Sequence, residues 1–544
     1  MNSTHPFLNQ QNAIRWSTLK PEAVGSDVTH ALESARKNID AISALGASDT
    51  ELTFENTFGA LDDATEDLSW AWGLVSHLMS VCDSEALREA HGAMLPAVTE
   101  FYSGIALNEE LWAVLEKFGE SDKVNELPEV IQRQVGETMA DFREQGADLH
   151  NEKKARLMEV QSELAEVTKK FSENVLDSTN AWELIVEDES ELAGLSQTAT
   201  DAALAAAIDK DLASKEDPKW RFTLHMPSFI PVIEQAESDA LREALWRGMM
   251  DIGRAEGKDN TELVWKILEL RKEKAQLLGK EHFADFTTSR RMAGSGANAL
   301  RFVDDLSDRL TAEYRDEVGA LEEYRAAKLD ADRELFEPWQ VSYWAEKRRR
   351  EEYAFDDEDT RPYFSVDHVI DGMFDLAKKI FGAQIDQLPS VFVENDGDSV
   401  PEGSYEVWHP EVKVFALRDV GDDEIRGIFY TDWHPRESKR GGAWMNTLRT
   451  GMPPINGQAR VPHLGLICGN MSPSVDGKPA LLTHNEVETV MHEFGHLIHH
   501  LFGEVPSKPL NGISVPWDFV ELPSQIMENF CWDRESLNLF ARHY

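Results

Sequence analysis

The chain has 544 residues, of which 42% are hydrophobic and 9% aromatic, with 33 glycines and 22 prolines. This composition is typical of a globular protein, and it excludes a disordered, collagenous or low-complexity chain. Lys and Arg number 54 against 99 Asp and Glu, which gives a formal net charge of −45. A polyanion of this size repels phosphate groups, so we expect neither nucleic acid nor an anionic membrane as a partner.

The beginning of the chain lacks both the basic and the apolar segment of a secretory signal, and no stretch approaches the roughly 18 uncharged apolar residues of a membrane span. The three cysteines, Cys82, Cys468 and Cys531, are widely spaced and form no CxxC pair. This pattern argues against a disulfide framework or a thiolate metal site and fits a reducing compartment. We therefore expect a soluble, cytoplasmic protein whose cysteines are small buried residues.

Helix-forming residues dominate from about Asp27 to Asn180. The clearest apolar stripe is formed by Leu157, Val160, Leu164, Val167 and Phe171. Its spacing of three and four residues predicts a helix with this face in the core. A segment rich in alanine and charge then ends at Asp217-Pro218, which favours a boundary at that point. We expect a helical amino-terminal region, residues 1–217, and a second region, residues 218–544.

The second region contains a predicted short strand from Arg221 and helical patterns over residues 237–274 and 297–326. Short runs of β-branched and aromatic residues, separated by Gly, Asp and Pro, predict strands at residues 405–408, 412–417, 425–430 and 464–468. The predicted fold is therefore mainly α, with a small β-sheet.

The sequence His492-Glu493-Phe494-Gly495-His496 matches the H-E-x-x-H pattern. On a helix, histidines four residues apart lie on one face and can both direct a ring nitrogen at one metal ion. The helix is predicted to begin at Thr483, which forms a capping box with Glu486, and to end at Gly503 in a left-handed conformation. The motif would then lie in the middle of the helix.

A chain of this length contains the motif by chance about one time in twenty, so its surroundings must support it. A catalytic zinc needs a third protein ligand and an open position. Glu521 and Glu528 are seven residues apart, and Ser514 and Pro516 suit the start of a helix that would direct both acids the same way. One acid could bind the metal while the other orients a ligand histidine. The histidines that follow the motif, His499 and His500, are expected to pack or lie at the surface.

The segments Thr483–His496 and Trp517–Phe530 resemble the thimet-oligopeptidase-type zinc peptidases. The resemblance extends to Phe171–Thr179, Arg361–Phe364 and Lys439–Met445, and so covers most of the chain. It implies one Zn²⁺ per chain, bound by His492, His496 and Glu521, with Glu493 as the general base and Glu528 as a residue that supports a ligand.

The resemblance implies a large helical, zincin-like peptidase in which residues 218–544 form the catalytic region and a deep channel admits the substrate. The expected activity is that of a zinc-dependent oligopeptidase, a monomer that cleaves within short peptides. A zinc-bound water would attack the peptide, with Glu493 taking the proton and later delivering it to the leaving amine. We also expect the strand around Leu464–Cys468 to bind the peptide backbone as an added strand, with an ordinary buried strand as the alternative.

Three other interpretations remain open. A dipeptidyl carboxypeptidase shares the metal motif and differs in how it holds the carboxyl end of its substrate. A catalytically silent peptide-binding protein would bind peptides without forming products, and a helical scaffold with an accidental motif would bind no zinc. Family members also continue beyond the point where this chain stops, so we expect a complete zinc site with an incomplete environment for the transition state.

Overall fold

The computed structural model describes residues 5–9, 12–354, 357–394, 399–455, 457–471, 474 and 479–544. The protein is mainly helical with small β-sheets, as the sequence predicts. Contacts divide the chain into two compact units, residues 1–149 with 357–544 and residues 150–356. This grouping differs from the expected boundary at residue 217, which lies inside the second unit; the two functional regions expected from the sequence stay a prediction.

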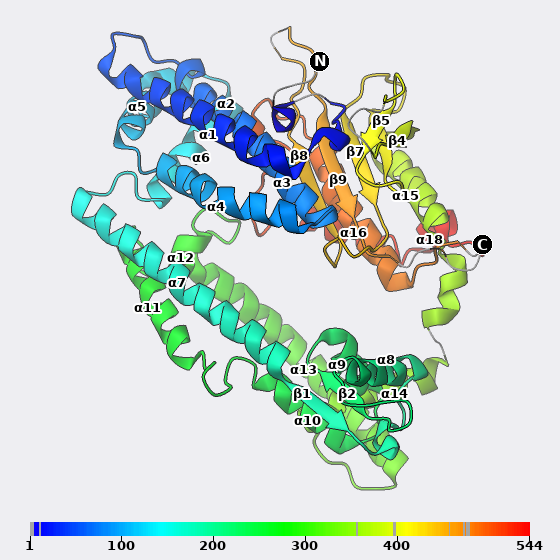
Figure 1. Ribbon diagram of the computed structural model, residues 1–544. Coiled ribbons are helices and arrows are strands. Elements are labelled where there is room, and N and C mark those ends of the chain that lie inside the picture. The colour runs from blue at the N-terminus through cyan, green and yellow to red at the C-terminus, as the bar shows by residue number, and fades with distance from the viewer. Residues whose placement is uncertain are drawn as a thin grey trace. The chain divides into compact units, whose positions relative to one another are not determined.

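The second unit consists of helices and one two-stranded sheet, which lies at one end of the unit (Figure 1). Its elements are α7 (Asn151–Ala181), β1 (Glu183–Val186), α8 (Gln197–Ile208), β2 (Trp220–Thr223), α9 (Met226–Gln235), α10 (Asp239–Met250), α11 (Thr261–Leu277), α12 (Phe283–Thr288), α13 (Gly296–Leu329) and α14 (Val341–Tyr353). The predicted apolar stripe lies on α7, where Leu157 and Val160 are buried and the other three members are only half-buried. Strands β1 and β2 pair antiparallel across the predicted boundary, and their sheet lies beside α8, α9 and α10.

The first unit begins with helices and continues, from residue 357, with one helix, a series of strands and then three more helices. The helices are α1 (Pro21–Ser43), α2 (Ala60–Ala64), α3 (Glu66–Val81), α4 (Glu85–Ile105), α5 (Glu109–Gly119), α6 (Glu129–Glu144), α15 (Val366–Phe381), α16 (His484–Leu501), α17 (Leu522–Asn529) and α18 (Arg534–Phe540). The strands are β3 (Ala383–Leu388), β4 (Ser390–Phe392), β5 (Tyr405–Val407), β6 (Lys413–Asp419), β7 (Gly427–Asp432), β8 (Trp444–Arg449) and β9 (His463–Cys468).

Five of these strands form one sheet in the order β3-β6-β7-β9-β8, in which β7 and β9 are parallel and the other pairs antiparallel. The strands predicted from residues 405, 412, 425 and 464 are confirmed as β5, β6, β7 and β9. Strands β3 and β8, at the two edges of the sheet, were not predicted. Edge strands are only partly buried here, so they lack the continuous apolar runs that mark β7 and β9.

The sheet lies between two hydrophobic cores because alternate residues of a strand point to opposite faces. On one face, Ile428 and Tyr430 of β7 belong to a core with α1 and with α3 to α6. On the other face, Phe429 of β7 and Ile467 of β9 belong to a core with α15, α16, α17 and α18. The sheet therefore fixes α16, which carries the histidine motif, within a three-layered unit (Figure 1).

Among the described residues, no helix is both long enough and apolar enough to cross a membrane. Cys468 and Cys531 are buried, as expected, whereas Cys82 is only half-buried.

Candidate metal centre and active site

Helix α16 begins where the sequence predicts. Thr483 is the N-cap: its hydroxyl accepts a hydrogen bond from the backbone amide of Glu486, and the carboxylate of Glu486 accepts one from the amide of Thr483, at 3.1 and 2.7 Å. This reciprocal pair satisfies two amides that the first turn leaves free. His492 and His496 consequently lie in the middle of a stable helix, on one face.

The end of α16 differs from the expectation for Gly503. The helix stops at Leu501, and Gly503 is not among the glycines with a positive φ. A Cβ on Gly503 would instead lie 2.4 Å from the Oδ1 atom of Asn511. Glycine is required at this position by the close approach of a later loop and not by a left-handed helix end.

The second acidic segment also folds differently from the prediction. Residues 517–520 form turns, α17 begins only at Leu522, and Glu521 is its N-cap residue. The predicted start at Ser514 or Pro516 is wrong. Pro523 lies in the first turn of α17, where its missing N–H costs nothing, and so marks the true start.

Gly495, at a variable position of the motif, determines how closely the two helices pack. A Cβ on this residue would lie 2.6 Å from the Cα of Ser524 and 2.9 Å from the carbonyl oxygen of Pro523. Only glycine allows this approach without a shift of the backbone. Sequence reasoning did not single out Gly495, although a glycine inside a helix generally has a packing reason.

This packing brings the three expected metal ligands together. One ligand atom from each of His492, His496 and Glu521 lies within 4.8 Å of the other two. The Oε2 atom of Glu521 is 3.3 Å from Nε2 of His492 and 3.1 Å from Nε2 of His496. The side chain of Glu521 is 54% exposed, so the site is open to solvent on one side.

The donor set and its spacing fit zinc. Atoms about 2.0–2.1 Å from a tetrahedral zinc ion lie about 3.3 Å from one another, close to both distances at Glu521. Two imidazoles and one carboxylate form a catalytic type of zinc site, which keeps the fourth position for water or substrate. Their assignment as ligands stays a prediction that this geometry supports.

Two further residues contact the candidate ligands. The Nδ1 atom of His492 lies 2.6 Å from Oε1 of Glu528, so the ring donates a proton to the carboxylate and leaves Nε2 free to bind a metal. The hydroxyl of Ser524, which is fully buried, lies 2.8 Å from the carbonyl oxygen of Glu521 and 3.1 Å from its Oε2 atom. Glu528 was expected in this role, whereas Ser524 was not. The sequence signal that could have identified Ser524 was its position three residues after Glu521.

Glu493 follows His492 in the chain but does not belong to the cluster of candidate ligands. The residue is 9% exposed. Burial raises the pKa of its carboxyl group, while the neighbouring His492 and a hydrogen bond from the backbone of Met445 act in the opposite direction. A carboxylate with a raised pKa is a stronger base. The structure thus places an acid suited to proton transfer beside the candidate metal ligands.

The strand beside Glu493 is β8, and this corrects the expectation for Leu464–Cys468. That segment is β9, which pairs with β7 on one side and with β8 on the other and so has no free edge. Among the strands that the structure describes, β8 pairs only with β9 and forms the edge of the sheet. An added strand needs unpaired backbone groups, so the edge available to a peptide is that of β8.

The turn before β8 is fixed by a buried lysine. The Nζ atom of Lys439 lies 2.8 Å from Oδ1 of Asp432, 2.7 Å from the carbonyl oxygen of that residue, and 2.9 Å from the carbonyl oxygen of His434. It also donates to the carbonyl oxygen of Gly469. Gly442, in the same segment, has a positive φ of +87°, as in a tight glycine turn.

Of the two histidines that follow the motif, His499 is half-buried and His500 is completely buried. The Nε2 atom of His500 lies 3.2 Å from the carbonyl oxygen of Arg449 in β8 and 3.3 Å from that of Leu464 in β9. Burial lowers the pKa of His500 to about 3, so the ring is neutral. His500 therefore connects α16 by hydrogen bonds to β8 and β9, at the edge of the sheet.

Comparison with known proteins agrees with this geometry. The pattern of peptidase family M3 matches residues 232–544, more than half of the chain, and that of the neurolysin/thimet oligopeptidase N-terminal domain matches residues 28–154. The chain belongs to peptidase family M3. Members of this metallopeptidase family are zinc-dependent, which fits the cluster of two histidines and a glutamate.

The similarity to individual family M3 relatives extends over nearly the whole chain. Oligopeptidase A of Escherichia coli (strain K12) is 36% identical over 547 residues, which cover 99% of this chain and 77% of that protein. Dipeptidyl carboxypeptidase of the same organism is 29% identical and covers 92% of this chain and 70% of that protein. A crystal structure described as a putative oligoendopeptidase F covers 95% of this chain and 69% of its own, with a TM-score of 0.44 and 12% identity.

Proposed function

We propose that this family M3 protein is a zinc-dependent oligopeptidase that cleaves within short peptides. The proposal rests chiefly on one arrangement: three ligand atoms of His492, His496 and Glu521 within 4.8 Å, beside the buried carboxyl group of Glu493. Two imidazoles, a carboxylate and a neighbouring acid are the groups that metal-assisted hydrolysis of a peptide requires.

One zinc ion would be held by His492, His496 and Glu521. When bound there, zinc lowers the pKa of a water molecule and polarises the carbonyl group of the peptide. Glu528 keeps the ring of His492 in the tautomer that leaves Nε2 unprotonated, and Ser524 orients the carboxylate of Glu521.

Glu493 is the general base in this proposal. Its carboxylate takes a proton from the attacking water and then passes it to the nitrogen of the leaving amine. The raised pKa of Glu493 suits both transfers, because the same group must accept a proton and release it.

The free edge of β8 is the proposed binding site for the peptide backbone. The backbone of Met445 donates a hydrogen bond to the carboxylate of Glu493, so the edge of β8 passes directly beside the proposed general base. A peptide added to this edge would be held by main-chain hydrogen bonds that do not depend on its sequence. Binding of this kind suits an enzyme that acts on many short peptides.

Internal cleavage is favoured over removal of dipeptides from the carboxyl end by the higher identity to oligopeptidase A, 36% against 29% for dipeptidyl carboxypeptidase. Peptides with an amidated carboxyl end distinguish the two activities. An endopeptidase cleaves them, whereas an enzyme that must hold a free terminal carboxylate does not.

The test is mass spectrometry of a pool of short peptides, half of them amidated, after incubation with the zinc-loaded protein. We expect internal cuts that disappear with a chelator and in Glu493→Gln, while the zinc content of that variant is unchanged. Equal activity of Glu493→Gln would contradict the assignment of the base. Peptide binding without any products from the unmutated chain would favour the silent peptide-binding protein.

A monomeric state, a cytoplasmic location and a deep channel stay predictions that accompany this proposal. Size-exclusion chromatography with light scattering tests the first, and fractionation of the source cells tests the second.

A further inference from the structure

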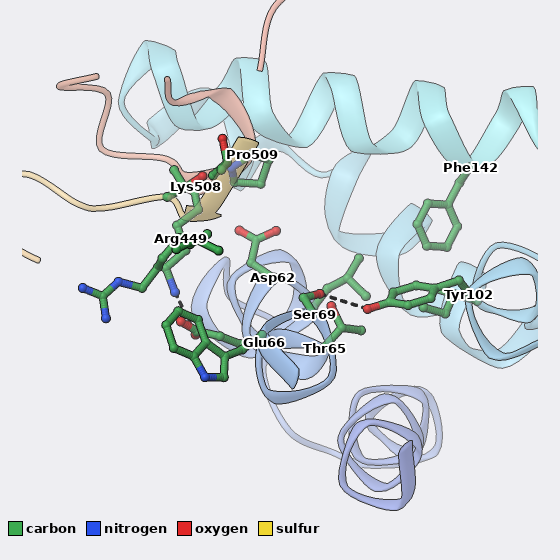
Figure 2. Close-up of a pocket in the computed structure, with 15 residues that line it drawn as sticks. Asp62, Thr65, Glu66, Ser69, Tyr102, Phe142, Arg449, Lys508 and Pro509 are labelled. Carbon is green, nitrogen blue, oxygen red and sulfur yellow. Dashed lines mark hydrogen bonds and ion pairs between the residues drawn. The ribbon is translucent and has the colours of Figure 1, made fainter. Parts of the chain in front are cut away.

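A cavity of about 570 Å³ opens where α2, α3, α4 and α6 meet the end of β8 (Figure 2). Its volume lies within the range of about 300–1,000 Å³ that is usual for ligand pockets. The helices contribute the apolar side chains of Leu61, Trp70, Ile105 and Phe142, and another part of the wall is formed by residues 447–449 of β8 with Thr450, which follows them. Nothing in the proposed mechanism uses this cavity.

Two carboxylates line the cavity, those of Asp62 and Glu66, and the hydrogen-bond donor to Asp62 is a neutral amide. Asp62 accepts a hydrogen bond from the buried side chain of Gln134. The nearby cation, Lys508, is held by Glu66 at 2.8 Å and by Asp63 at 3.6 Å. Burial raises the pKa of Asp62 to about 7 although Gln134 and Lys508 lower it. A second cation in the cavity would therefore stabilise the carboxylate.

The other positively charged side chain that lines the cavity, that of Arg449, does not act as this second cation for Asp62. The guanidinium of Arg449 lies 5.9 Å from the ring centre of Trp70, and Figure 2 shows it directed away from Asp62. Its Nη2 atom donates to the side chain of Asn12 and, at 3.1 Å, to the carbonyl oxygen of Pro462. The space in front of Asp62 is thus left to a ligand.

The cavity adjoins the strand edge on which we place the peptide. Met445 of β8 lies beside Glu493, and Thr447 and Arg449, which line the cavity, follow two and four residues later. A bulge between Thr447 and Arg449 alters the direction of the strand there. Because a strand advances about 3.3 Å per residue, a bound peptide would bring to the cavity a side chain two to four residues from the cut bond.

We propose that this cavity is a specificity pocket for a lysine or arginine side chain of the peptide. The aliphatic part of that side chain would pack against Leu61, Trp70 and Ile105, and its cation would pair with Asp62. An acidic side chain would meet the carboxylates of Asp62 and Glu66, with Lys508 already engaged, and should be rejected. This inference rests on the proposed function, since it assumes a peptide on the edge of β8.

The test measures binding separately from hydrolysis. Peptides that the unmutated chain cleaves define the cut bond; lysine, norleucine, glutamine or glutamate is then placed at each of the four positions on either side. Dissociation constants are measured with zinc-loaded Glu493→Gln. We expect lysine to bind about tenfold more tightly than norleucine at one position two to four residues from the cut, as for a hydrogen bond to a charged group.

Asp62→Asn, added to Glu493→Gln, should abolish that preference and leave the affinity for the norleucine peptide unchanged, because an amide oxygen can still accept from Gln134. Asp40→Asn is the matched control, since Asp40 is an exposed acid on α1 that does not line the cavity, and should keep the preference. Ser69→Trp, which fills the cavity from α3 without altering Asp62, should also abolish it and serves if Asp62→Asn does not fold.

No preference for lysine at any position, or a preference that persists in Asp62→Asn and in Ser69→Trp, would overturn the pocket. If no peptide is cleaved by the unmutated chain, the proposed function fails instead. Binding of the same peptides, with lysine moved through every position, then still tests the pocket by its dependence on Asp62.

Discussion

The Nδ1 atom of His492 lies 2.6 Å from Oε1 of Glu528, thirty-six residues later in the chain. A carboxylate can only accept a hydrogen bond, so this contact fixes the proton on Nδ1 and directs the lone pair of Nε2 toward Glu521 and His496. The candidate metal site is therefore supported by a residue outside the cluster of His492, His496 and Glu521.

Glu528→Ala should weaken zinc binding by about 10- to 100-fold, the usual effect of removing such a supporting group. Glu528→Gln should weaken it less, because the amide oxygen still accepts the hydrogen bond although the charge is lost. Competition with a chromogenic chelator measures both affinities. Glu535→Ala, at an exposed acid on α18, is the control. Unchanged zinc affinity in Glu528→Ala would show that His492 needs no such support.

Gly495→Ala should lower the free energy of unfolding by about 1–3 kcal/mol, as overpacking of a tight contact does. The added Cβ would lie 2.6 Å from the Cα of Ser524 and push α17 away from α16. Because Glu521 begins α17, zinc affinity should fall at the same time. Urea unfolding and chelator competition measure the two effects.

Gly73→Ala is the matched control for this substitution. Gly73 lies within α3, and a Cβ there would meet nothing within 4 Å. Alanine should therefore stabilise the protein by up to about 1 kcal/mol through its higher helix propensity. Equal effects of the two substitutions would mean that the crossing at Gly495 is looser than the structure indicates.

Much of the site could be predicted because its signals are local. The caps of α16 and the spacing of His492 and His496 depend on residues within one helix, and these predictions agree with the structure at the helix start. The role of Glu521 came from the resemblance to a family. Its local structure was predicted incorrectly because the proline that marks the start of α17 follows the residues that appeared to begin a helix.

The remaining features depend on contacts that a sequence pattern does not contain. The sequence predicted that Gly503 ends α16 in a left-handed conformation. Glycine is needed there instead because Asn511, in a later loop, approaches it closely. The strand at Leu464–Cys468, which is β9, was expected to bind the peptide because it lies shortly before the histidine motif, but it is paired on both sides, as its continuous apolar run indicates. The first compact unit joins residues 1–149 to residues 357–544, and no local composition reveals that connection.

The stability of the protein should depend on Asp432 in acid. Burial alone would raise the pKa of this carboxyl group, but hydrogen bonds and charges from Arg436 and Lys439 outweigh it and lower the pKa to about 2. An unfolded aspartate has a pKa of about 3.9. The stabilisation is therefore complete above about pH 4 and is lost as the pH falls toward 2, by about 2 kcal/mol for this group.

Asp432→Asn should lower the free energy of unfolding at pH 7 by about 3–5 kcal/mol, because it leaves the buried charge of Lys439 without a partner. The difference from the unmutated protein should shrink between pH 4 and pH 2. Asp375→Asn, at an exposed acid on α15, should show no such change. Urea unfolding curves between pH 2 and pH 7 measure the dependence, and a difference that stays constant with pH would contradict it.

Zinc should stabilise the fold as well as permit catalysis, because its ligands come from α16 and from the start of α17, which separate on unfolding. A ligand that binds only the folded state stabilises it by about 2.7 kcal/mol at 100 times its dissociation constant. The midpoint temperature of unfolding of the chelator-treated protein should therefore rise when zinc is restored.

Magnesium should raise this midpoint little, since it prefers oxygen ligands to imidazole. In Glu521→Ala the shift with zinc should shrink, because two histidines alone bind the ion weakly. The same midpoint with and without zinc in the unmutated protein would show that His492, His496 and Glu521 do not form a metal site.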